Sequence, residues 1–254
     1  MRKLSILLII LPIILLSAQV EIKAQAEIPN WKISGAIAAL ESQNPLIRKI
    51  ALDTLGNFTD QDLIPVFIRM LRDENSAVRI AAARALGRQA EIAPAAIPAL
   101  GDALDDPKPQ VRAAAATALG FFEMQAVSEA ARLGAVLADS NPEVRANAAL
   151  ALGNLGDAAA PEIANIATLL KDENRLVRLC AVEALANLGE IATPEASKLL
   201  PLFNDPDPDI STAAAWVICQ MGEEAAVVAP QLISLLENPN QTARNNALNA
   251  LNCL

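Results

Sequence analysis

A single sequence pattern recurs along most of this 254-residue chain. Its anchor is a β-branched residue followed by arginine. An alanine stands four residues after the β-branched position, and a leucine or isoleucine stands eight residues after it. The anchors begin at residues 47, 78, 111, 144 and 177, so the interval is 31 residues once and 33 thereafter. The pattern weakens in two further copies, Ile210-Ser211 and Ala243-Arg244. A fixed period of this length is typical of repeat proteins, in which each unit packs against its neighbours.

The spacing within each copy predicts two helices. Positions 0, 4, 8 and 11 from the anchor fall within about 80° on a helical wheel, which indicates one buried stripe on the second helix of each unit. A leucine or phenylalanine seven residues before each anchor marks a preceding helix, and prolines near the start of that helix suit its first turn. A pair of helices of about 12 residues each cannot bury its own apolar stripe, whereas a stack of such pairs can.

We therefore predict an all-α fold, an α-solenoid (superhelix) of about seven helix pairs that forms one domain over residues 27–254. The chain is 53% hydrophobic but only 3% aromatic, and this reliance on alanine and leucine also favours helices over strands. Gly156, Gly189 and Gly222 suit the C-terminal caps of helices. Several asparagines in the last helix suit a terminal repeat that closes the stack.

This pattern resembles HEAT repeats, especially the short HEAT-like repeats of phycobilisome-lyase-type proteins, over nearly all of the chain after residue 26. The resemblance implies a ladder in which an aspartate in the turn between the two helices is joined to an arginine early in the second helix. The matching pairs are Asp73 with Arg79, Asp106 with Arg112, Asp139 with Arg145, and Asp172 with Arg178. Ser42, Ser211 and Asn238 interrupt the series, so we expect the ladder to be weakest at both ends.

Elementary chemistry supports a structural role for these residues. An aspartate at the start of a helix can accept hydrogen bonds from free backbone amides, and its charge suits the positive end of the helix dipole. The five donors of arginine can bridge that carboxylate and the turn of the next repeat. Ankyrin repeats share the period, but their signature needs a histidine and the chain has none; the spaced tryptophan and tyrosine of tetratricopeptide repeats are also missing.

The first 26 residues have the three parts of an export signal. Arg2 and Lys3 precede an apolar run over residues 4–16, and residues 24–26 (Ala-Gln-Ala) offer the pattern that signal peptidase accepts. The alternative is an uncleaved anchor, but 13 apolar residues fall short of the roughly 20 that a membrane-spanning helix needs. We therefore expect residues 1–26 to be removed, no stable membrane insertion afterwards, and export to a periplasm, a lumen or the cell exterior.

The charge of the chain bears on its partners. The net charge is −9 and the pI is near 4.6. Cleavage after residue 26 would remove three basic residues and one acidic residue, which leaves a net charge of −11. An acidic protein with few aromatic side chains has neither the attraction nor the stacking platforms that nucleic acid requires. We expect no nucleic-acid partner, and anionic membrane surfaces are disfavoured for the same reason.

The sequence offers no recognisable catalytic constellation. The absence of histidine excludes Ser-His-Asp and Cys-His nucleophile systems, imidazole metal sites, and the His-Glu iron sites of the HEAT-repeat deoxyhypusine hydroxylases. No glycine-rich phosphate loop is present. Asp205, Asp207 and Asp209 alternate like the start of a calcium loop, but the sixth and twelfth positions do not fit, which favours a solvated turn. We predict no catalytic residue, cofactor or metal site.

Three cysteines have different expected roles. Cys180 stands at a position of small packing residues, which predicts a place in the core. Cys219 and Cys253 fall at similar heights on neighbouring helices, and an oxidising compartment permits a bond between them. However, stacked helix axes lie about 8–10 Å apart, and a disulfide prefers Cα atoms within about 7 Å. The spacing therefore disfavours a bond.

Positions 2 and 6 from the anchor lie on the side of the second helix opposite the buried stripe. In a HEAT stack the second helices line the concave face, so apolar residues there would form a partly apolar groove for a partner. The candidate groove residues are Ile80, Arg84, Leu150, Leu179, Glu183 and Trp216. The alternative is that these side chains are tucked under inter-repeat turns or scattered singly.

Two functions of different class follow. The first is a monomeric, non-catalytic adaptor that binds a protein or peptide along the solenoid. The second comes from the resemblance to HEAT-type bilin lyases, which implies attachment or detachment of chromophores on light-harvesting proteins, or a chaperone role for them. The export signal argues against the second function, because that chemistry is expected in the cytoplasm.

Overall fold

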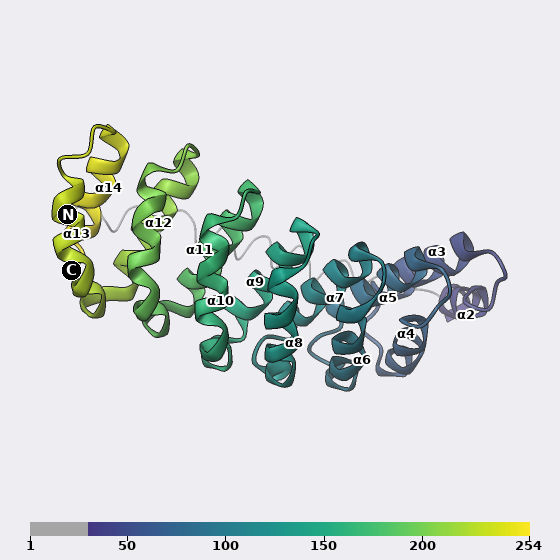
Figure 1. The fold of residues 1–254 in the computed structure, drawn as a ribbon. Helices are drawn as coiled ribbons and strands as arrows, with labels where there is room; N and C mark the ends of the chain where they lie inside the picture. The colour runs from purple at the N-terminus through teal and green to yellow at the C-terminus, as the bar shows by residue number, and fades with distance from the viewer. Residues whose placement is uncertain (1–29) are drawn as a thin grey trace, which may run out of the picture.

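The computed structural model describes residues 30–254 of the chain, so the predicted export signal at residues 1–26 lies outside the described part. The described residues form an α-solenoid of seven helical pairs (Figure 1). The second helices of the pairs are α3 (Pro45–Leu55), α5 (Ser76–Arg88), α7 (Pro109–Phe121), α9 (Pro142–Asn154), α11 (Arg175–Leu188), α12 (Pro208–Met221) and α14 (Gln241–Leu251). This architecture confirms the predicted fold class.

The first helices are less regular than predicted, and their α-helical parts are shorter than the expected length of about 12 residues. Their α-helical parts are α2 (Asn30–Ala39), α4 (Ile64–Met70), α6 (Ile97–Asp102), α8 (Ala130–Ala135), α10 (Ile163–Thr168) and α13 (Ala229–Leu235). Turns of 3₁₀ helix extend most of them, namely η1 (Gln61–Leu63), η2 (Pro94–Ala96), η3 (Ala103–Asp105), η4 (Glu123–Glu129), η5 (Val136–Ala138), η6 (Gly156–Glu162), η7 (Leu169–Lys171) and η9 (Gly222–Val228). In the sixth pair, η8 (Gly189–Asn204) replaces the α-helix altogether and contains Pro194 and Pro201, each of which removes a backbone donor.

The core runs continuously along the stack between the two layers of helices. The first residue of the anchor is fully buried in every repeat from Val78 to Ala243, and so is the alanine four residues later. The largest fully buried side chains, Phe67, Phe122 and Phe203, fill the space between the layers. The N-terminal repeat has no predecessor within the described residues, and there Ile47 is 43% exposed at the position that is buried elsewhere.

Neighbouring second helices approach closely through a glycine. A Cβ atom added to Gly153 of α9 would lie 2.8 Å from the Cα atom of Ala184 in α11, and Gly56, Gly87 and Gly120 meet the following helix in the same way. The glycines therefore allow the helices to pack backbone against backbone. The row ends at α11, where Ala186 stands in the equivalent position and α12 presents Val217 instead of an alanine. Correspondingly, α11 packs less extensively against α12 than against α9.

The three glycines predicted to cap helices, Gly156, Gly189 and Gly222, lie at helix ends and all have positive φ angles of 56° to 64°, which favour glycine. The ψ angles of Gly189 and Gly222, −129° and −154°, differ from those of the left-handed helical cap that was expected. The equivalent residue of the third repeat is Glu123, which has a φ of 49°.

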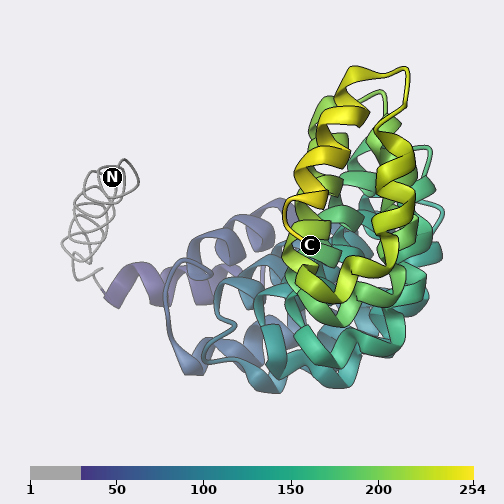
Figure 2. The same ribbon diagram turned by 90° about the vertical axis from the view of Figure 1, so that its left-hand side faces the viewer.

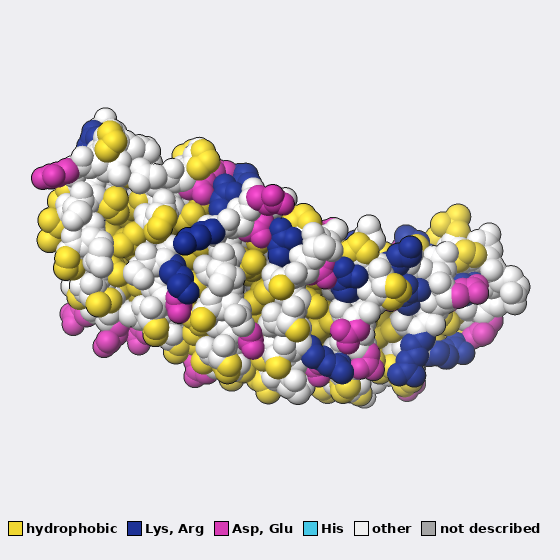
Figure 3. Space-filling model, viewed as in Figure 1, with side chains coloured by type: hydrophobic (Ala, Val, Ile, Leu, Met, Phe, Trp, Pro, Cys, Tyr) yellow, Lys and Arg dark blue, Asp and Glu magenta, His cyan; other side chains and the backbone are white. Residues whose placement is uncertain are grey.

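The stack is elongated, bowed and twisted (Figures 1 and 3). Viewed from the C-terminal end, the N-terminal repeats swing toward the side on which α14 lies, while α13 lies on the other side (Figure 2). The second helices therefore line the inner side of the curve. Small groups of basic and acidic side chains interrupt an otherwise neutral surface on the face shown in Figure 3. In residues 30–254, no helix is long and apolar enough to cross a membrane.

Candidate functional site

The turns before the second helices are built by two polar side chains in succession. In the turn before α9, Asp139 Oδ1 accepts a hydrogen bond from the amide of Asn141 at 2.8 Å. Asn141 is itself the N-cap, and its side chain accepts from the amides of Glu143 and Val144. The ladder aspartate therefore accepts a backbone amide, as expected, but it shapes the turn two residues before the cap. An asparagine or aspartate at this cap position in six of the seven repeats is the sequence signal for it.

Each ladder arginine joins two repeats through its guanidinium group. Arg145 Nε donates to Asp172 Oδ2 at 2.7 Å and Arg145 Nη2 donates to Asp172 Oδ1 at 2.8 Å, which makes a bidentate pair with the next repeat. Arg145 Nη1 donates to the backbone carbonyl of Asp139 in its own repeat at 2.8 Å. The same arrangement joins Arg79 to Asp106, Arg112 to Asp139, and Arg178 to Asp205. The aspartate within a repeat therefore offers its carbonyl, not its carboxylate, to the arginine of that repeat.

This geometry corrects the expectation of a weak N-terminal end. Arg48 makes the bidentate pair with Asp73, at 2.7 and 2.8 Å. Ser42 fills the place of the aspartate without weakening the ladder. Arg48 donates to the backbone carbonyl of Ser42, and the Ser42 hydroxyl accepts a hydrogen bond from the amide of Asn44. Sequence reasoning missed Arg48 and Asp205 because it paired residues within a repeat. At the C-terminal end the ladder does stop, since Ser211 replaces the arginine.

Burial and hydrogen bonding have opposite effects on the ladder carboxylates. Partial burial disfavours the ionised form of Asp139, but the hydrogen bonds from Arg112 and from the amide of Asn141 outweigh it and hold the pKa of Asp139 below its usual value. The pKa values of Asp73 and Asp172 are lowered by the same balance. These carboxylates therefore stay ionised in the folded protein to a lower pH than in the unfolded chain.

The six candidate groove residues line three hollows along the face formed by the second helices, which we call the second-helix face, and the first two hollows adjoin at Thr117 and Asn147. Ile80 and Arg84 line a hollow of about 350 Å³ together with Lys49 and Glu143. A smaller hollow of about 160 Å³ lies between α7 and α9 and is lined by Leu150. The third, of about 330 Å³, lies between α11 and α12 and is lined by Leu179, Glu183 and Trp216.

The exposure of these residues divides them into two groups. The side chains of Ile80, Leu150 and Leu179 are half-buried against the core, as the alternative interpretation of tucked residues expected. Arg84 and Glu183 are exposed, and Trp216 is 54% exposed. Side chains at the second position after the anchor are buried or half-buried in most repeats, whereas those at the sixth position are exposed in most repeats.

Sequence reasoning missed one aromatic residue on this face. Phe121, the last residue of α7, is 60% exposed and lines the same hollow as Leu150. It stands ten residues after the anchor. That position is exposed in every repeat, and it falls on the same side of the helix as the sixth position, four residues earlier.

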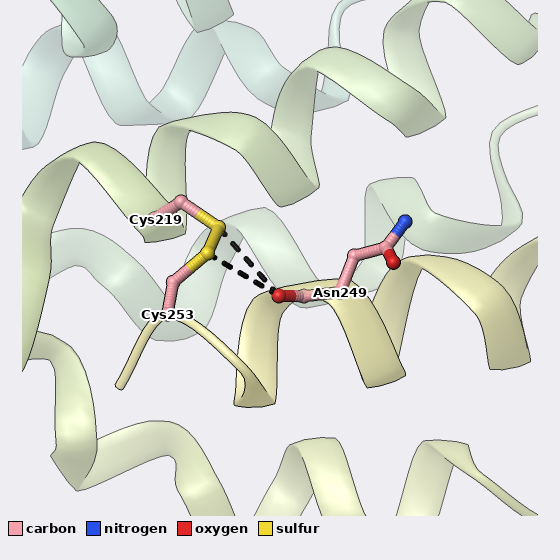
Figure 4. The surroundings of a disulfide bond; sticks show 3 residues. All are labelled: Cys219, Asn249 and Cys253. Atoms are coloured by element: carbon pink, nitrogen blue, oxygen red, sulfur yellow. Dashed lines mark hydrogen bonds between the residues drawn. A yellow bond between two sulfur atoms is a disulfide. The ribbon is translucent and has the colours of Figure 1, made fainter. Parts of the chain in front are cut away.

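The structure overturns the expectation for Cys219 and Cys253 and confirms the one for Cys180. Cys219 and Cys253 form a disulfide, with Cα atoms 5.1 Å apart (Figure 4). The spacing argument was wrong because it used the distance between helix axes. Cα atoms lie about 2.3 Å from their axis, so Cα atoms that face each other on neighbouring helices can approach to about 5 Å. Both sulfur atoms lie beside the carbonyl oxygen of Asn249. Cys180 is buried as predicted, and burial raises the pKa of its thiol to about 11.

The alternating aspartates before α12 are used within the fold. Asp205 pairs with Arg178, Asp207 caps α12 and pairs with Arg175, and Asp209 also pairs with Arg175. In the part of the chain that the structure describes, no group of three or more acidic or cysteine side chains could hold a metal ion.

Comparison with known proteins agrees with this architecture. A family model of HEAT repeats matches residues 33–120 and 130–201. The complex of CpcE and CpcF of phycocyanin lyase from Nostoc sp. PCC7120 is similar in structure, with a TM-score of 0.55 and 24% identity over 87% of this chain and 94% of that one. Computationally designed armadillo repeat proteins for modular peptide recognition give a TM-score of 0.57 and 21% identity over 75% of this chain and 99% of that one.

A third similar structure is Kap121p bound to Pho4p, with a TM-score of 0.61 and 18% identity. It covers 88% of this chain but only 29% of the larger protein. No curated protein sequence matches the chain. At these identities the structural likenesses concern the fold alone.

Proposed function

Because the chain belongs to the HEAT-repeat family, we propose that it is a non-catalytic scaffold that binds a protein or peptide along its second-helix face. The observation that carries the proposal is the row of three hollows on that face. Exposed aromatic side chains, Phe121 and Trp216, stand beside two of the hollows, and aromatic residues are common anchors of protein interfaces. Equivalent positions of neighbouring second helices lie about 10 Å apart, roughly three residues of strand. The third hollow lies two such steps beyond the second, so an extended peptide of about six further residues would reach it.

We further propose that the scaffold is exported. The N-terminal sequence has the composition of an export signal, and the Cys219–Cys253 disulfide suits an oxidising compartment. The partner would then be an envelope, luminal or extracellular protein.

The experiment that tests the scaffold function is a tagged pull-down of the protein from its native host, with captured proteins identified by mass spectrometry. We expect one enriched protein that is lost when Leu150→Glu and Trp216→Glu are introduced together. The matched control is Val227→Glu combined with Met124→Glu, which places the same two charges at 70% exposed apolar residues of η9 and η4, outside the second helices. Enrichment that is equal in all three proteins would refute binding along the second-helix face.

The likeness to the phycocyanin lyase complex brings a second candidate, a chromophore-handling function. The two candidates differ in a direct readout. A visible absorption band on the protein purified from its host would favour the second candidate, whereas a colourless protein with a captured partner would favour the scaffold.

A further inference from the structure

The hollow between α11 and α12 lies where the row of glycines ends. Between α9 and α11 the contact of Gly153 with Ala184 brings the two backbones together. In the next interface Ala186 and Val217 occupy the equivalent positions, and both residues line the hollow of about 330 Å³. The larger side chains keep the helices apart on this face and leave space for an occupant. We call this hollow the Trp216 pocket; besides Ala186 and Val217 it is lined by Leu179, Val182, Glu183, Asn187, Ala213 and Trp216.

The walls and the rim of the Trp216 pocket differ in chemistry. The walls are aliphatic, and Leu179 and Ala213 are only half-buried there, so apolar area remains open to an occupant. The rim carries the exposed indole of Trp216 and the carboxylate of Glu183, which stand at the same position of adjacent helices. Within the described residues the Glu183 carboxylate joins none of the ion pairs. A largely aliphatic hollow lined also by an exposed indole and a carboxylate outside the ion pairs is complementary to a long cationic side chain.

The charge of the surrounding repeats points the same way. Residues 159–224, which contain the pocket, hold four basic and eleven acidic residues, a net charge of −7. Residues 30–92, at the other end of the stack, hold eight basic and seven acidic residues. The pocket thus lies in the acidic part of the molecule, where the field attracts a cation and repels an anion.

We propose that the Trp216 pocket binds a lysine or arginine side chain of the partner. The aliphatic stem lies along Leu179 and Val217, and the charged end lies over the indole of Trp216 and against the carboxylate of Glu183. The inference rests on the proposed scaffold function and deepens it, because it gives the partner a basic residue that anchors it on repeats five and six.

The test uses small probes, so it does not depend on knowing the partner. The chain has two tryptophans, and Trp31→Phe leaves Trp216 as the sole indole. The indole N–H signal of Trp216 is followed by NMR during titration with N-acetyl-arginine amide, and with N-acetyl-citrulline amide as the uncharged probe of the same shape. We expect saturable shifts with arginine and affinity at least about fivefold weaker with citrulline, as the loss of a cation–π contact and an ion pair implies.

Two variants complete the design. Glu183→Gln should weaken arginine binding about threefold while it leaves citrulline binding unchanged, because only the charged pair is lost. Asp53→Asn is the matched control, since it removes a negative charge at the same helical position of the distant first repeat. Equal affinity for the two probes, or no effect of Glu183→Gln, overturns the inference.

The outcome is separable from that of the proposed function. If the pull-down captures a partner that Trp216→Glu with Leu150→Glu releases but Glu183→Gln does not, the scaffold stands and the cationic anchor fails. If the arginine probe binds as expected but no partner is captured, the pocket chemistry stands and the scaffold function fails.

Discussion

Arg145 and Asp172, which lie 27 residues apart in the chain, face each other in a planar bidentate pair at 2.7 and 2.8 Å. Both side chains are largely buried, with 13% and 9% of their surface exposed. The third nitrogen of the guanidinium group reaches the carbonyl of Asp139 in the preceding turn. One side chain thus connects two turns that no regular secondary structure links.

We expect Arg145→Ala to lower the free energy of unfolding by about 2–3 kcal/mol, because the Asp172 carboxylate would be left partly buried without its partner. The measurement is urea denaturation followed by circular dichroism. Arg244→Ala is the matched control. In the described structure Arg244 bonds only the backbone carbonyls of Asn238 and Pro239, so its loss should cost less than about 1 kcal/mol. Equal losses in the two variants would show that the bidentate pair adds nothing.

The ladder also predicts how stability depends on pH. Asp73, Asp139 and Asp172 have lowered pKa values in the folded state, whereas in the unfolded chain they titrate near about pH 4. Between the folded and unfolded values the unfolded chain binds more protons, so the free energy of unfolding should fall as the pH drops below about 4. Above about pH 5 these groups should contribute a constant stabilisation.

Urea midpoints measured from neutral to acidic pH test this dependence. In Arg145→Ala the Asp172 carboxylate loses its main ionic partner, so the acid-dependent part of the curve should become shallower than in the unmodified protein. A curve of identical shape in both proteins contradicts the assignment of the acid sensitivity to the ladder.

The sequence predicted the helix pairs because the repeated valine, alanine and leucine positions specify one buried stripe whatever the neighbouring units contain. It could not decide whether Asp139 pairs with Arg112 or with Arg145, since both fit an aspartate in the turn and an arginine on the following helix. The choice depends on how far one repeat is displaced from the next, and that is a property of the packed stack.

The division of the groove into hollows was equally hidden from the sequence. It depends on how closely the second helices pack. Where Ala186 replaces the repeated glycine, α11 packs less extensively against α12 than it does against α9. The disulfide escaped prediction because the separation of helix axes was compared with a limit that applies to Cα atoms, and facing Cα atoms lie closer than the axes. Only the third hollow had a signal in the sequence, namely the loss of glycine directly after the repeated helical leucine in the fifth repeat.

Glu123 and Gly156 occupy the same place in successive repeats, and both have positive φ angles, 49° and 58°. For Gly156 this conformation is free of strain, and a Cβ atom there would meet nothing within 4 Å. Gly156→Ala should therefore destabilise the protein by about 1 kcal/mol through backbone strain alone. Glu123→Gly should stabilise it by a smaller amount, because relief of strain is partly offset by the greater freedom of glycine in the unfolded chain.

Thermal melting of the two variants checks these opposite signs. Glu123→Ala is the control, because it removes the Glu123 side chain but keeps the strain. If Glu123→Ala stabilises the protein as much as Glu123→Gly, the effect arises from the carboxylate and not from the backbone.

The disulfide ties the last repeat to the sixth. It closes a loop of 34 residues, and loss of such a constraint costs about 3 kcal/mol when the linked segments unfold together. Hydrogen exchange should show that the α14 amides lose protection when Cys253→Ser is introduced or a reductant is added, while those of α7 and α9 do not change. Cys180→Ala, which removes a buried thiol and leaves the bond intact, is the control for general destabilisation. Unchanged protection of α14 in the reduced protein would contradict this role.

The ladder can be extended by one step at its C-terminal end. Asn238 Oδ1 already accepts the amide of Asn240 at 2.9 Å, as the ladder aspartates do in their turns, so replacing Asn238 by aspartate keeps that turn. The missing partner is the arginine that Ser211 replaces. We expect Ser211→Arg and Asn238→Asp to stabilise the protein together by about 1 kcal/mol more than the sum of their separate effects.

A double-mutant cycle from urea denaturation measures this coupling. Each single variant should be neutral or destabilising, because Ser211→Arg adds a guanidinium group without a carboxylate and Asn238→Asp adds a carboxylate without a cation. The coupling should vanish in acid, when the carboxylate introduced by Asn238→Asp becomes protonated. A purely additive result would mean that the sixth and seventh repeats are held in a different relative position from the others, too far apart for an arginine to bridge.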